Sequence, residues 1–567
     1  MTSVNTTVLI VGGGPAGLLS GMLLDQLGID FVIVERHADL HQAPQAHVIS
    51  SRSLEICRAV GIDDASIRAL GPDPMQTRAV RWVDRLLGRD LGVFTLGSDP
   101  GEVHRMLTQS PTPTTNLSQD QFEQVLFGRL AETAGAEKVR FGHRWEGFKE
   151  LPGGGYVSTV VAGDETLSIS SKYLIGADGA GSRVRKACGF DMVGPDNIQT
   201  FVTVHFKADL GESLQGREGL LYWVMDEQVD GVFIAHDIDR GNWIFMKTVD
   251  ETENLEKLDE ARFAGLLREA IGADVPHEVL SLNSWRMTSQ ISSGYRKDGV
   301  FLVGDAAHRF PPTGGIGMNT GFQDVHNLIW KIGMVEGGMD AGIFDTYEPE
   351  RKPVAQTNSE QSFHNARKMM EVAVQLDANG DGKITADDLT AVLADDSRQA
   401  AVQQAIDAQA AHFNMAGLDL GVCYSGRGVI EDGAPPVSEN PVSVYLPSTT
   451  PGARLPHAPH APLERDGAPI STLDLVPYDR FLVWTQSDAD DGLNAVVAEL
   501  TQQGVPVSLQ RLSEQAGIQP VDDSFAALFP SNEVLVLRPD GHIAARVPAN
   551  QAAEGVARAI GQLWSGA

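Results

Sequence analysis

The chain has 567 residues, of which 42% are hydrophobic and 21% are charged, so it is long enough for several domains with separate cores. Its formal charge of −31 repels phosphate backbones and anionic lipid surfaces, which argues against nucleic-acid and membrane partners. Cys57, Cys188 and Cys423 lie far apart and form no CxxC pair, which argues against a disulfide scaffold. We therefore expect a protein of the cytoplasm.

A dinucleotide-binding βαβ unit is predicted at the N-terminal end of the chain. Residues 7–11 and 31–34 are short apolar runs typical of buried parallel strands, and residues 16–28 between them favour a helix. The intervening loop carries Gly12, Gly14 and Gly17 at GxGxxG spacing, and Glu35 ends the second strand. Such glycines permit a tight turn against a pyrophosphate, while the carboxylate can bind a ribose. This pattern predicts a site for FAD or NAD rather than NADP.

Two later segments extend the same predicted sheet. Residues 173–178 and 300–305 are apolar runs that end on Asp178 and Asp305, at the strand edge where open α/β sheets bind ligands. A glycine-rich turn follows Asp305 and leads into another predicted helix. The helix N-terminus would suit the negative charge of a reduced flavin. Two anion-binding turns far apart in the chain favour one long cofactor, FAD.

A second sheet is predicted between these parallel-strand regions. Its strands alternate or cluster apolar and aromatic side chains, with turns between them, at residues 200–206, 219–225, 231–236 and 242–248. This pattern is typical of antiparallel strands. Because residues 300–305 return to the parallel pattern, the sheet is predicted to be an insertion into the first domain.

The rest of the chain is predicted to be helical first and mixed later. Residues 315–376 favour helix with a break at Pro349 and Pro353, and residues 383–416 favour helix again. Residues 426–462 are rich in proline and indicate an extended linker. Residues 471–567 predict a small α/β unit with strands at 480–484 and 534–537 and a helix at 551–564.

These motifs together resemble those of the class A flavoprotein monooxygenases, the single-component aromatic hydroxylases. The resemblance is carried by the glycine fingerprint with Glu35, by the DG motif Asp178–Arg183, and by residues 304–319 with their Gly-Asp start and Pro-Pro pair. Weaker matches lie at Gln119, at residues 347–353 and at residues 451–457. The likeness is greatest to phenol, chlorophenol and hydroxybiphenyl hydroxylases, with polyketide hydroxylases as more distant relatives.

The resemblance implies an α/β protein of four parts. The first is a discontinuous Rossmann-like FAD-binding domain at residues 1–185 and 281–376, and the second is an inserted antiparallel-sheet substrate domain at residues 186–280. Residues 377–450 form a helical and linker segment, and residues 451–567 form a thioredoxin-like domain. The last domain has no cysteine, so its expected role is structural or dimer-forming.

The resemblance also implies a reaction. NADPH or NADH reduces FAD, O₂ forms a flavin C4a-hydroperoxide, and a phenolic or related aromatic substrate is hydroxylated. A homodimer is expected. Two alternatives stay open: a Baeyer–Villiger or epoxidising oxygenase that acts on a larger polyketide-type substrate, and a flavin-bound interaction module without turnover.

Residue by residue, the resemblance supplies candidate FAD contacts. They are Gly12, Gly14, Pro15, Ala16, Gly17, Glu35, Arg36, Gln45, Arg52, Gln119, Asp178, Asp305, Pro312, Gly315, Gly317, Met318 and Asn319. Gln45 stands where the family often has an arginine for the pyrophosphate. Arg52 is the candidate that would supply the missing charge.

The catalytic candidate is His47, which matches an active-site histidine of the hydroxybiphenyl-type enzymes. As a general base it would remove the phenol proton, and its ordinary pKa of about 6.5 suits this work near neutrality. The alternative is a packing histidine. Tyr222, Trp223 and Trp243 are candidates to contact the aromatic ring, and Arg240 to contact a phenolate or carboxylate. Core packing, and a solvated turn for Arg240, are the alternatives.

A calcium-like loop is predicted where the family resemblance offers no precedent. Residues 377–388 follow the EF-hand pattern, with candidate ligands at Asp377, Asn379, Asp381, Lys383 and Asp388. Aspartate at the last position is shorter than the usual glutamate, and the motif occurs once. The alternative is a polar turn between two helices.

Overall fold

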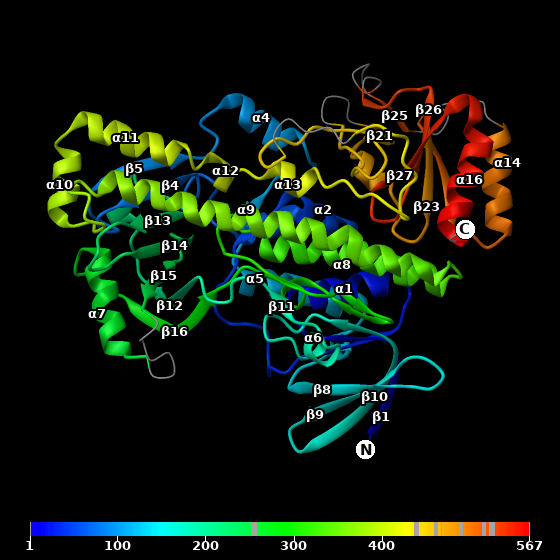
Figure 1. The fold of residues 1–567 in the computed structure, drawn as a ribbon, viewed down its shortest axis with the longest axis horizontal. Coiled ribbons are helices and arrows are strands. Elements are labelled where there is room, and N and C mark those ends of the chain that lie inside the picture. Colours follow the sequence, from blue (N-terminus) through cyan, green and yellow to red (C-terminus); the bar gives the residue numbers. More distant parts are fainter. Residues whose placement is uncertain are drawn as a thin grey trace.

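The computed structural model describes residues 2–250, 258–435, 441–458, 463–465, 468–486, 491–512, 518–520, 525 and 528–565. It is an elongated molecule with one sheet unit at each end and the N-terminal sheet between and below them (Figure 1). No helix in these ranges is long and apolar enough to cross a bilayer. Parts of the predicted linker and tail lie outside the described residues.

The N-terminal sheet has eight strands and is parallel at its centre, as predicted. Its main order is β18-β19-β10-β1-β2-β7, and β9 joins β10 to β8. The strands are β1 (Thr2–Val11), β2 (Phe31–Val34), β7 (Val139–Arg140), β8 (His143–Glu150), β9 (Tyr156–Ala162), β10 (Glu165–Gly176), β18 (Arg296–Lys297) and β19 (Val300–Leu302). Fully buried residues such as Leu9, Ile33 and Leu174 make its core, so the continuous apolar runs are explained by burial on both faces.

Helices cover this sheet. α1 (Pro15–Gln26) packs between α5 (Gln119–Thr133) and α8 (Gly317–Glu336). Shorter helices follow at α2 (Ser51–Ala59), α3 (Asp64–Leu70), α4 (Pro100–Thr108) and α6 (Arg183–Ala187). Two short pairings connect the loops, β3 (Val48–Ile49) with β6 (Thr115–Asn116), and β17 (Gln290–Ser292) with β11 (Met192–Val193) and β20 (His308–Arg309).

The second sheet has seven strands in the order β16-β12-β15-β14-β13-β4-β5. They are β4 (Ala79–Val83), β5 (Asp90–Thr95), β12 (Gln199–Lys207), β13 (Leu221–Val224), β14 (Gly231–Asp237), β15 (Asn242–Val249) and β16 (Glu278–Met287). The predicted antiparallel strands are present, but β4 and β5 come from the first segment of the chain and complete the sheet. α7 (Glu260–Ile271) packs against one face, where Phe263 and Leu267 join its core.

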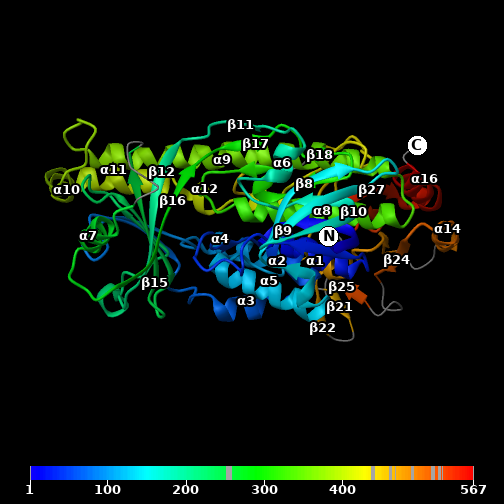
Figure 2. The same cartoon turned by 90° about the horizontal axis from the view of Figure 1, so that it is seen from below.

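One long helix links the two sheets. α9 (Tyr347–Leu376) runs beside α8 at one end and beneath α10 (Ala386–Leu393), α11 (Asp396–Asp407) and α12 (Ala410–Phe413) at the other (Figures 1 and 2). The expected break at Pro349 and Pro353 is wrong, because both prolines lie inside α9. Pro349 falls in the first turn, where backbone N–H groups have no helical partner to lose. The interruption lies instead between α8 and α9, at the turn around Gly337 and Gly338 and the 3₁₀ segment Ala341–Thr346.

The C-terminal unit is a four-stranded sheet in the order β24-β23-β26-β27. β23 (Phe481–Thr485) pairs in parallel with β24 (Val507–Arg511), while β26 (Glu533–Leu537) and β27 (Ile543–Pro548) are antiparallel. α14 (Asp491–Gln502) and α16 (Ala552–Ser565) pack together beside it. The smaller elements are α13 (Ala416–Leu420), β21 (Leu463–Arg465), β22 (Ala468–Ile470) and β25 (Ile518–Pro520).

Candidate functional site

The first glycine turn lies between β1 and α1 and brings backbone against backbone. A side chain on Gly12 would meet the carbonyl oxygen of Ala177 at 2.2 Å, and one on Gly17 would meet the carbonyl oxygen of Gly12 at 1.9 Å. At Gly14, by contrast, no atom lies within 4 Å of the Cβ position. Gly12 and Gly17 are therefore needed for packing, while Gly14 borders open space where an anion can approach.

The N-terminus of α1 has the electrostatics of an anion site. Gly14 is its N-cap, Pro15 and Ala16 begin the helix, and its first turn carries no acidic side chain. No side chain caps it, so the first backbone N–H groups are left for a ligand. This arrangement fits a pyrophosphate.

Glu35 lies over the same turn and is held by the backbone. Its Oε2 accepts from the N–H of Gly13 at 2.8 Å and its Oε1 from the N–H of His37 at 2.8 Å. A carboxylate fixed at the end of β2 is suited to a ribose hydroxyl. Arg36 next to it is exposed and bonds through Nε to His37 at 3.1 Å, so the structure points its side chain toward solvent.

The two strand-end aspartates have different environments. Asp178 holds the start of α6, whose N-cap is Ser182, because its Oδ2 accepts from the N–H of Arg183 at 2.6 Å and of Val184 at 3.1 Å. Burial raises the pKa of this carboxyl, and the hydrogen bonds from Ser182 and from these two N–H groups oppose the rise. Asp305 follows β19 with an exposed side chain and is the more accessible of the two to a cofactor hydroxyl.

The second glycine-rich turn ends at the start of α8. Gly317 opens the helix, no side chain caps it, and its first turn has no acidic residue, so it again offers N–H groups to negative charge. Asn319 is a structural tie, since its Nδ2 donates to the carbonyls of Val48 (3.0 Å) and Gly315 (2.7 Å). Pro312 is exposed and Met318 is partly buried, and both belong to the same turn and helix start.

The segment before β3 is exposed at Gln45, whose Nε2 lies 2.9 Å from Nε2 of His41. Gln119 begins α5 beside it and donates its backbone N–H to the carbonyl of Ala46 at 2.8 Å. The side chain of Gln119 donates to Glu123 at 2.8 Å. These contacts keep Gln45 and Gln119 close in space, although they are far apart in the sequence.

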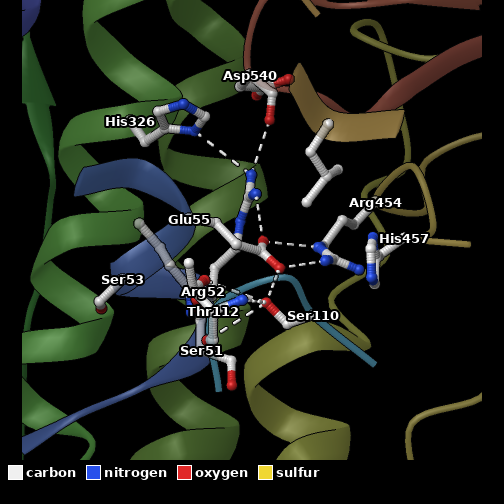
Figure 3. A network of polar contacts seen from close by, with 12 residues as sticks. Ser51, Arg52, Ser53, Glu55, Ser110, Thr112, His326, Arg454, His457 and Asp540 are labelled. Carbon is white, nitrogen blue, oxygen red and sulfur yellow. Dashed lines mark hydrogen bonds and ion pairs between the residues drawn. The ribbon is translucent and has the colours of Figure 1, made fainter. Parts of the chain in front are cut away.

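Arg52 does not offer its charge to this turn, so the expectation that it replaces the missing arginine is wrong. It is 7% exposed, and it donates to Oε2 of Glu55 at 3.0 Å and to the carbonyl of Asp540 at 2.8 Å. Figure 3 shows its guanidinium between Glu55, His326 and Asp540, with Arg454 on the other side of Glu55. The reason is tertiary: Asp540 and Arg454 come from the C-terminal part of the chain, whose position the sequence does not reveal.

His47 directly precedes β3, and the carbonyl of the next residue, Val48, accepts a hydrogen bond from Asn319 beside the second glycine-rich turn. The pairing of β3 with β6 brings His47 to Asn116, whose amide oxygen lies 3.1 Å from Nδ1 of this histidine. Because this oxygen accepts the Nδ1–H, Nε2 keeps a lone pair that can accept a proton. Burial lowers the pKa of His47, and the hydrogen bond to Asn116 opposes this, so the ring is neutral at neutral pH.

The face of the second sheet that meets His47 carries a buried histidine. His236 on β14 lies with its ring edge-on to His47, and the ring centroids are 5.6 Å apart. On β12, which β15 separates from β14 in the sheet, Nε2 of His205 lies 2.8 Å from Oδ1 of Asn242. The sequence alone did not single out His205 and His236. Each is the sequence neighbour of a core-facing residue, Phe206 or Ala235, so the alternation of side chains along a strand could have predicted that both lie on the opposite face.

Tyr222 and Trp243 lie on the other face of this sheet, so their assignment to the substrate face is wrong. Both are fully buried in the core with Phe263 and Leu267 of α7. Tyr222 donates its hydroxyl to the carbonyl of Arg217 at 2.8 Å, and Trp243 donates to Ala208 at 3.1 Å. Side chains alternate between faces along a strand, and aromatic character alone does not show which face is the core.

Trp223 does lie on the same face as His236. Its partner in the β13–β14 register is Val232, two residues before Ile234 on that face. It packs beside Val372 and Leu376 of α9, which cover this end of the sheet. Arg240 is in the turn after β14, where it pairs with Asp237 at 3.2 Å and its side chain is 57% exposed. The solvated-turn alternative therefore describes Arg240.

An aromatic surface that the sequence did not single out lies on β12 and β16. The rings of Phe201 and Trp285 stack with centroids 4.8 Å apart, and both side chains are only partly buried. Trp285 is fixed by a 3.0 Å hydrogen bond from Nε1 to Oγ1 of Thr203. Phe201, Thr203 and His205 lie two residues apart along β12, so their side chains lie on the same face of the sheet. The aromatic surface therefore continues the face that holds the histidines.

The predicted calcium loop is closed by its own hydrogen bonds. Asp377 accepts the N–H groups of Gly380 (2.7 Å) and Gly382 (2.8 Å), and Asp388 forms a capping box with Thr385 at the start of α10. Within the described parts of the chain, no three His, Cys, Asp or Glu side chains are grouped to hold a metal ion. The loop also bonds to the second sheet, through the N–H of Glu227 and the carbonyl of Ile384 at 3.0 Å. A calcium site here stays a prediction.

Comparison with known proteins identifies the class of this chain. The family described as "FAD binding domain" matches residues 5–362, and "Aromatic-ring hydroxylase, C-terminal" matches residues 448–567. The chain belongs to the FAD-dependent aromatic-ring hydroxylases, and it is an FAD-dependent aromatic monooxygenase.

Relatives named as chlorophenol monooxygenases and as tetracenomycin monooxygenases are similar to this chain over nearly its whole length. A 2,4-dichlorophenol 6-monooxygenase of Cupriavidus pinatubonensis is 29% identical over 97% of this chain and 95% of its own. The tetracenomycin B2 monooxygenase-dioxygenase of Streptomyces olivaceus is 29% identical over 96% of each chain. The crystal structure of the flavin-dependent monooxygenase PieE, with FAD and substrate, superposes with a TM-score of 0.89 at 29% identity, over 99% of this chain and 100% of that one. FAD is therefore the cofactor that this chain's FAD-binding domain implies.

Proposed function

We propose that this monooxygenase hydroxylates a phenolic or related aromatic compound, with NADPH or NADH as reductant and O₂ as oxidant. The observation that carries the proposal is the arrangement of His47 and Asn116. A neutral imidazole with its Nδ1–H engaged leaves Nε2 to accept the phenol proton. Removal of that proton raises the electron density of the ring, which the hydroxylation requires.

In this proposal, the chain's own residues bind FAD, orient the aromatic substrate and remove its phenol proton. FAD, when bound, supplies the electrons and activates the oxygen. Candidate FAD contacts are the uncapped starts of α1 and α8, Glu35 and Asp305, while Asp178 and Asn319 hold the turns in place. The stacked rings of Phe201 and Trp285 offer a flat apolar surface that can orient an aromatic substrate.

The test measures NADPH and NADH oxidation by the FAD-loaded protein in air, with and without a panel of phenols, and the product mass. We expect stimulation by at least one phenol and a product heavier by one oxygen atom. His47→Gln should lower kcat by about 10²–10⁴-fold at unchanged FAD content. The absence of stimulation by any phenol, or a His47→Gln enzyme with full activity, would overturn the proposal.

A second candidate is a Baeyer–Villiger or epoxidising oxygenase for a larger polyketide-type substrate. It is favoured by the partly buried, stacked rings of Phe201 and Trp285 and by the likeness to the tetracenomycin B2 enzyme. Oxygen insertion beside a ketone needs no phenol deprotonation. In that case polycyclic ketones would stimulate turnover, the product would be a lactone or epoxide by NMR, and His47→Gln would keep most of the activity.

We also propose that the four domains follow the predicted boundaries, with β4 and β5 added to the substrate domain. A βαβ unit followed by a ββα unit supports a thioredoxin-like fold for the C-terminal part. Its buried contacts with Arg52 and Glu55 favour a structural role. A homodimer is testable by light scattering of the purified protein at several concentrations.

A further inference from the structure

The imidazole of His236 is buried without a hydrogen-bond partner. The residue is 5% exposed, and neither Nδ1 nor Nε2 bonds to any atom of the described residues. A neutral imidazole carries one donor and one acceptor, and leaving both unmade in a buried place is unfavourable. A polar atom of a ligand is the group that would satisfy this ring.

The position of His236 beside His47 indicates which atom of the ligand would bind it. Its ring lies edge-on to His47, and at a centroid separation of 5.6 Å one oxygen atom can contact both rings. Nδ1 of His47 is already engaged by Asn116, so its Nε2 is the atom left for the ligand. The two histidines come from β14 and from the start of β3, which belong to different sheets.

The electrostatic surroundings keep His236 neutral. Burial lowers its pKa well below the ordinary value, and positive charge on His47 or on His205 would lower it further. His205 is itself bonded to Asn242. If His47 takes up a proton, His236 therefore stays uncharged and retains one N–H to donate.

We propose that His236 binds the same phenolic oxygen that His47 deprotonates, by donating a ring N–H to it. The inference rests on the proposed function. In the step, the O–H bond breaks, the proton moves to Nε2 of His47, and the electron pair stays on the oxygen. A buried histidine is a weak base toward a phenol, and a donor aimed at the developing anion makes the transfer more favourable.

The test follows the ionisation of 4-nitrophenol bound to the FAD-loaded protein, through the visible absorbance of its phenolate. In the wild type we expect the bound phenol to have a lower apparent pKa than the free one. His236→Leu should raise that apparent pKa by about one unit, a tenfold change, and should weaken binding above neutral pH. His236→Asn, which keeps an N–H donor, should recover part of the shift.

The matched control is His205→Gln. This residue lies on the same sheet face and is 9% exposed, but its Nε2 already bonds to Asn242, so the bound phenol should ionise as in the wild type. A second readout is thermal melting without ligand. Because leucine removes an unsatisfied polar group, His236→Leu should melt at or above the wild-type Tm.

The outcomes separate the two proposals. If His47→Gln changes the ionisation but His236→Leu does not, the role of His236 is overturned and the proposed function stands. If neither variant changes the ionisation of bound 4-nitrophenol, the role of both histidines in the phenolic function fails. Loss of folding or a lower Tm in both His236 variants, with unchanged phenol ionisation where it is measurable, would make His236 a packing residue and overturn the inference.

Discussion

At the scale of single residues, the environment of His47 decides how the proposed activity responds to pH. Only the neutral ring can accept a proton, and burial lowers the pKa of His47 below its ordinary value of about 6.5. The neutral form is thus the main form at pH 7 and is lost as the pH falls through the lowered pKa. We expect the acid limb of kcat/KM to lie below pH 6.5.

Asn116→Asp should move that limb to higher pH. A carboxylate beside Nδ1 stabilises the imidazolium and raises the pKa of His47, by about one unit or more. The measurement is the pH profile of kcat/KM for one phenol in both proteins. An acid limb that does not move would show that His47 is not the group whose titration controls turnover.

A pair of glycine substitutions tests the cofactor turn. Gly14→Ala places its methyl group in open space, so the protein should fold but bind FAD at least about tenfold more weakly, since the backbone can no longer approach the pyrophosphate. Gly17→Ala would bring its methyl group to 1.9 Å from the carbonyl of Gly12 and should prevent correct folding. Flavin fluorescence gives the affinity and circular dichroism gives the fold. Equal FAD affinity of Gly14→Ala and the wild type would contradict the assignment.

At the scale of elements, the two faces of the second sheet have different roles. Trp243→Ala empties a fully buried site and should lower the free energy of unfolding by about 3–5 kcal/mol. Trp285→Ala removes a partly buried ring from the opposite face and should mainly raise KM for the aromatic substrate. Urea unfolding and steady-state kinetics on both variants separate the effects. A stability loss in Trp285→Ala as large as in Trp243→Ala would argue that both rings are core.

The loop between α9 and α10 gives a prediction about calcium. Asp377 closes it by accepting backbone N–H groups, so Asp377→Ala should lower the stability of this region by about 1 kcal/mol. If the polar-turn alternative is right, that cost is the same in EDTA and in millimolar CaCl₂. A wild-type Tm that rises with CaCl₂, and no longer does so in Asp377→Ala, would instead support the calcium site.

At the scale of the whole molecule, buried ion pairs fasten the C-terminal unit to α9. Arg538 donates to both oxygens of Glu350 at 2.6 and 2.9 Å, and Lys331 of α8 lies 2.8 Å from the same carboxylate. All three side chains are fully buried. Arg538 and Lys331 lower the pKa of Glu350 to about 2, against the opposing effect of burial.

Glu350→Gln should therefore lower the free energy of unfolding by about 3–5 kcal/mol at pH 7, because it leaves buried cations without their anion. In the wild type, the carboxylate's contribution is complete above its unfolded pKa of about 4.5 and is lost as the pH falls toward 2. Glu360→Gln, at an exposed position of the same helix, should change stability by less than about 1 kcal/mol. Chemical unfolding at several pH values measures both, and equal effects would contradict this role for the network.

Local signals in the sequence predicted the geometry of the two glycine-rich turns, while the role of their residues in binding FAD stays a prediction. These signals depend on only a few neighbouring residues. They are the glycines that lie against backbone, the acidic residue at a strand end and the uncapped helix start. The prolines of α9 misled the prediction because their effect depends on position within the helix. The assignment of Tyr222 and Trp243 failed because composition shows burial but not which face of a sheet is buried.

The sequence by itself determined the class of the protein, the parallel sheet and the two glycine-rich turns, since these depend on short-range spacing. The tertiary structure alone decided which residues meet across long chain separations. It placed Asn116 and His236 beside His47 and enclosed Arg52 in a contact with Asp540. It also placed Trp285, and not Trp243, on the sheet face that carries the histidines. The physical reason is that strand pairing and domain packing, which bring distant segments together, leave little trace in the local order of residues.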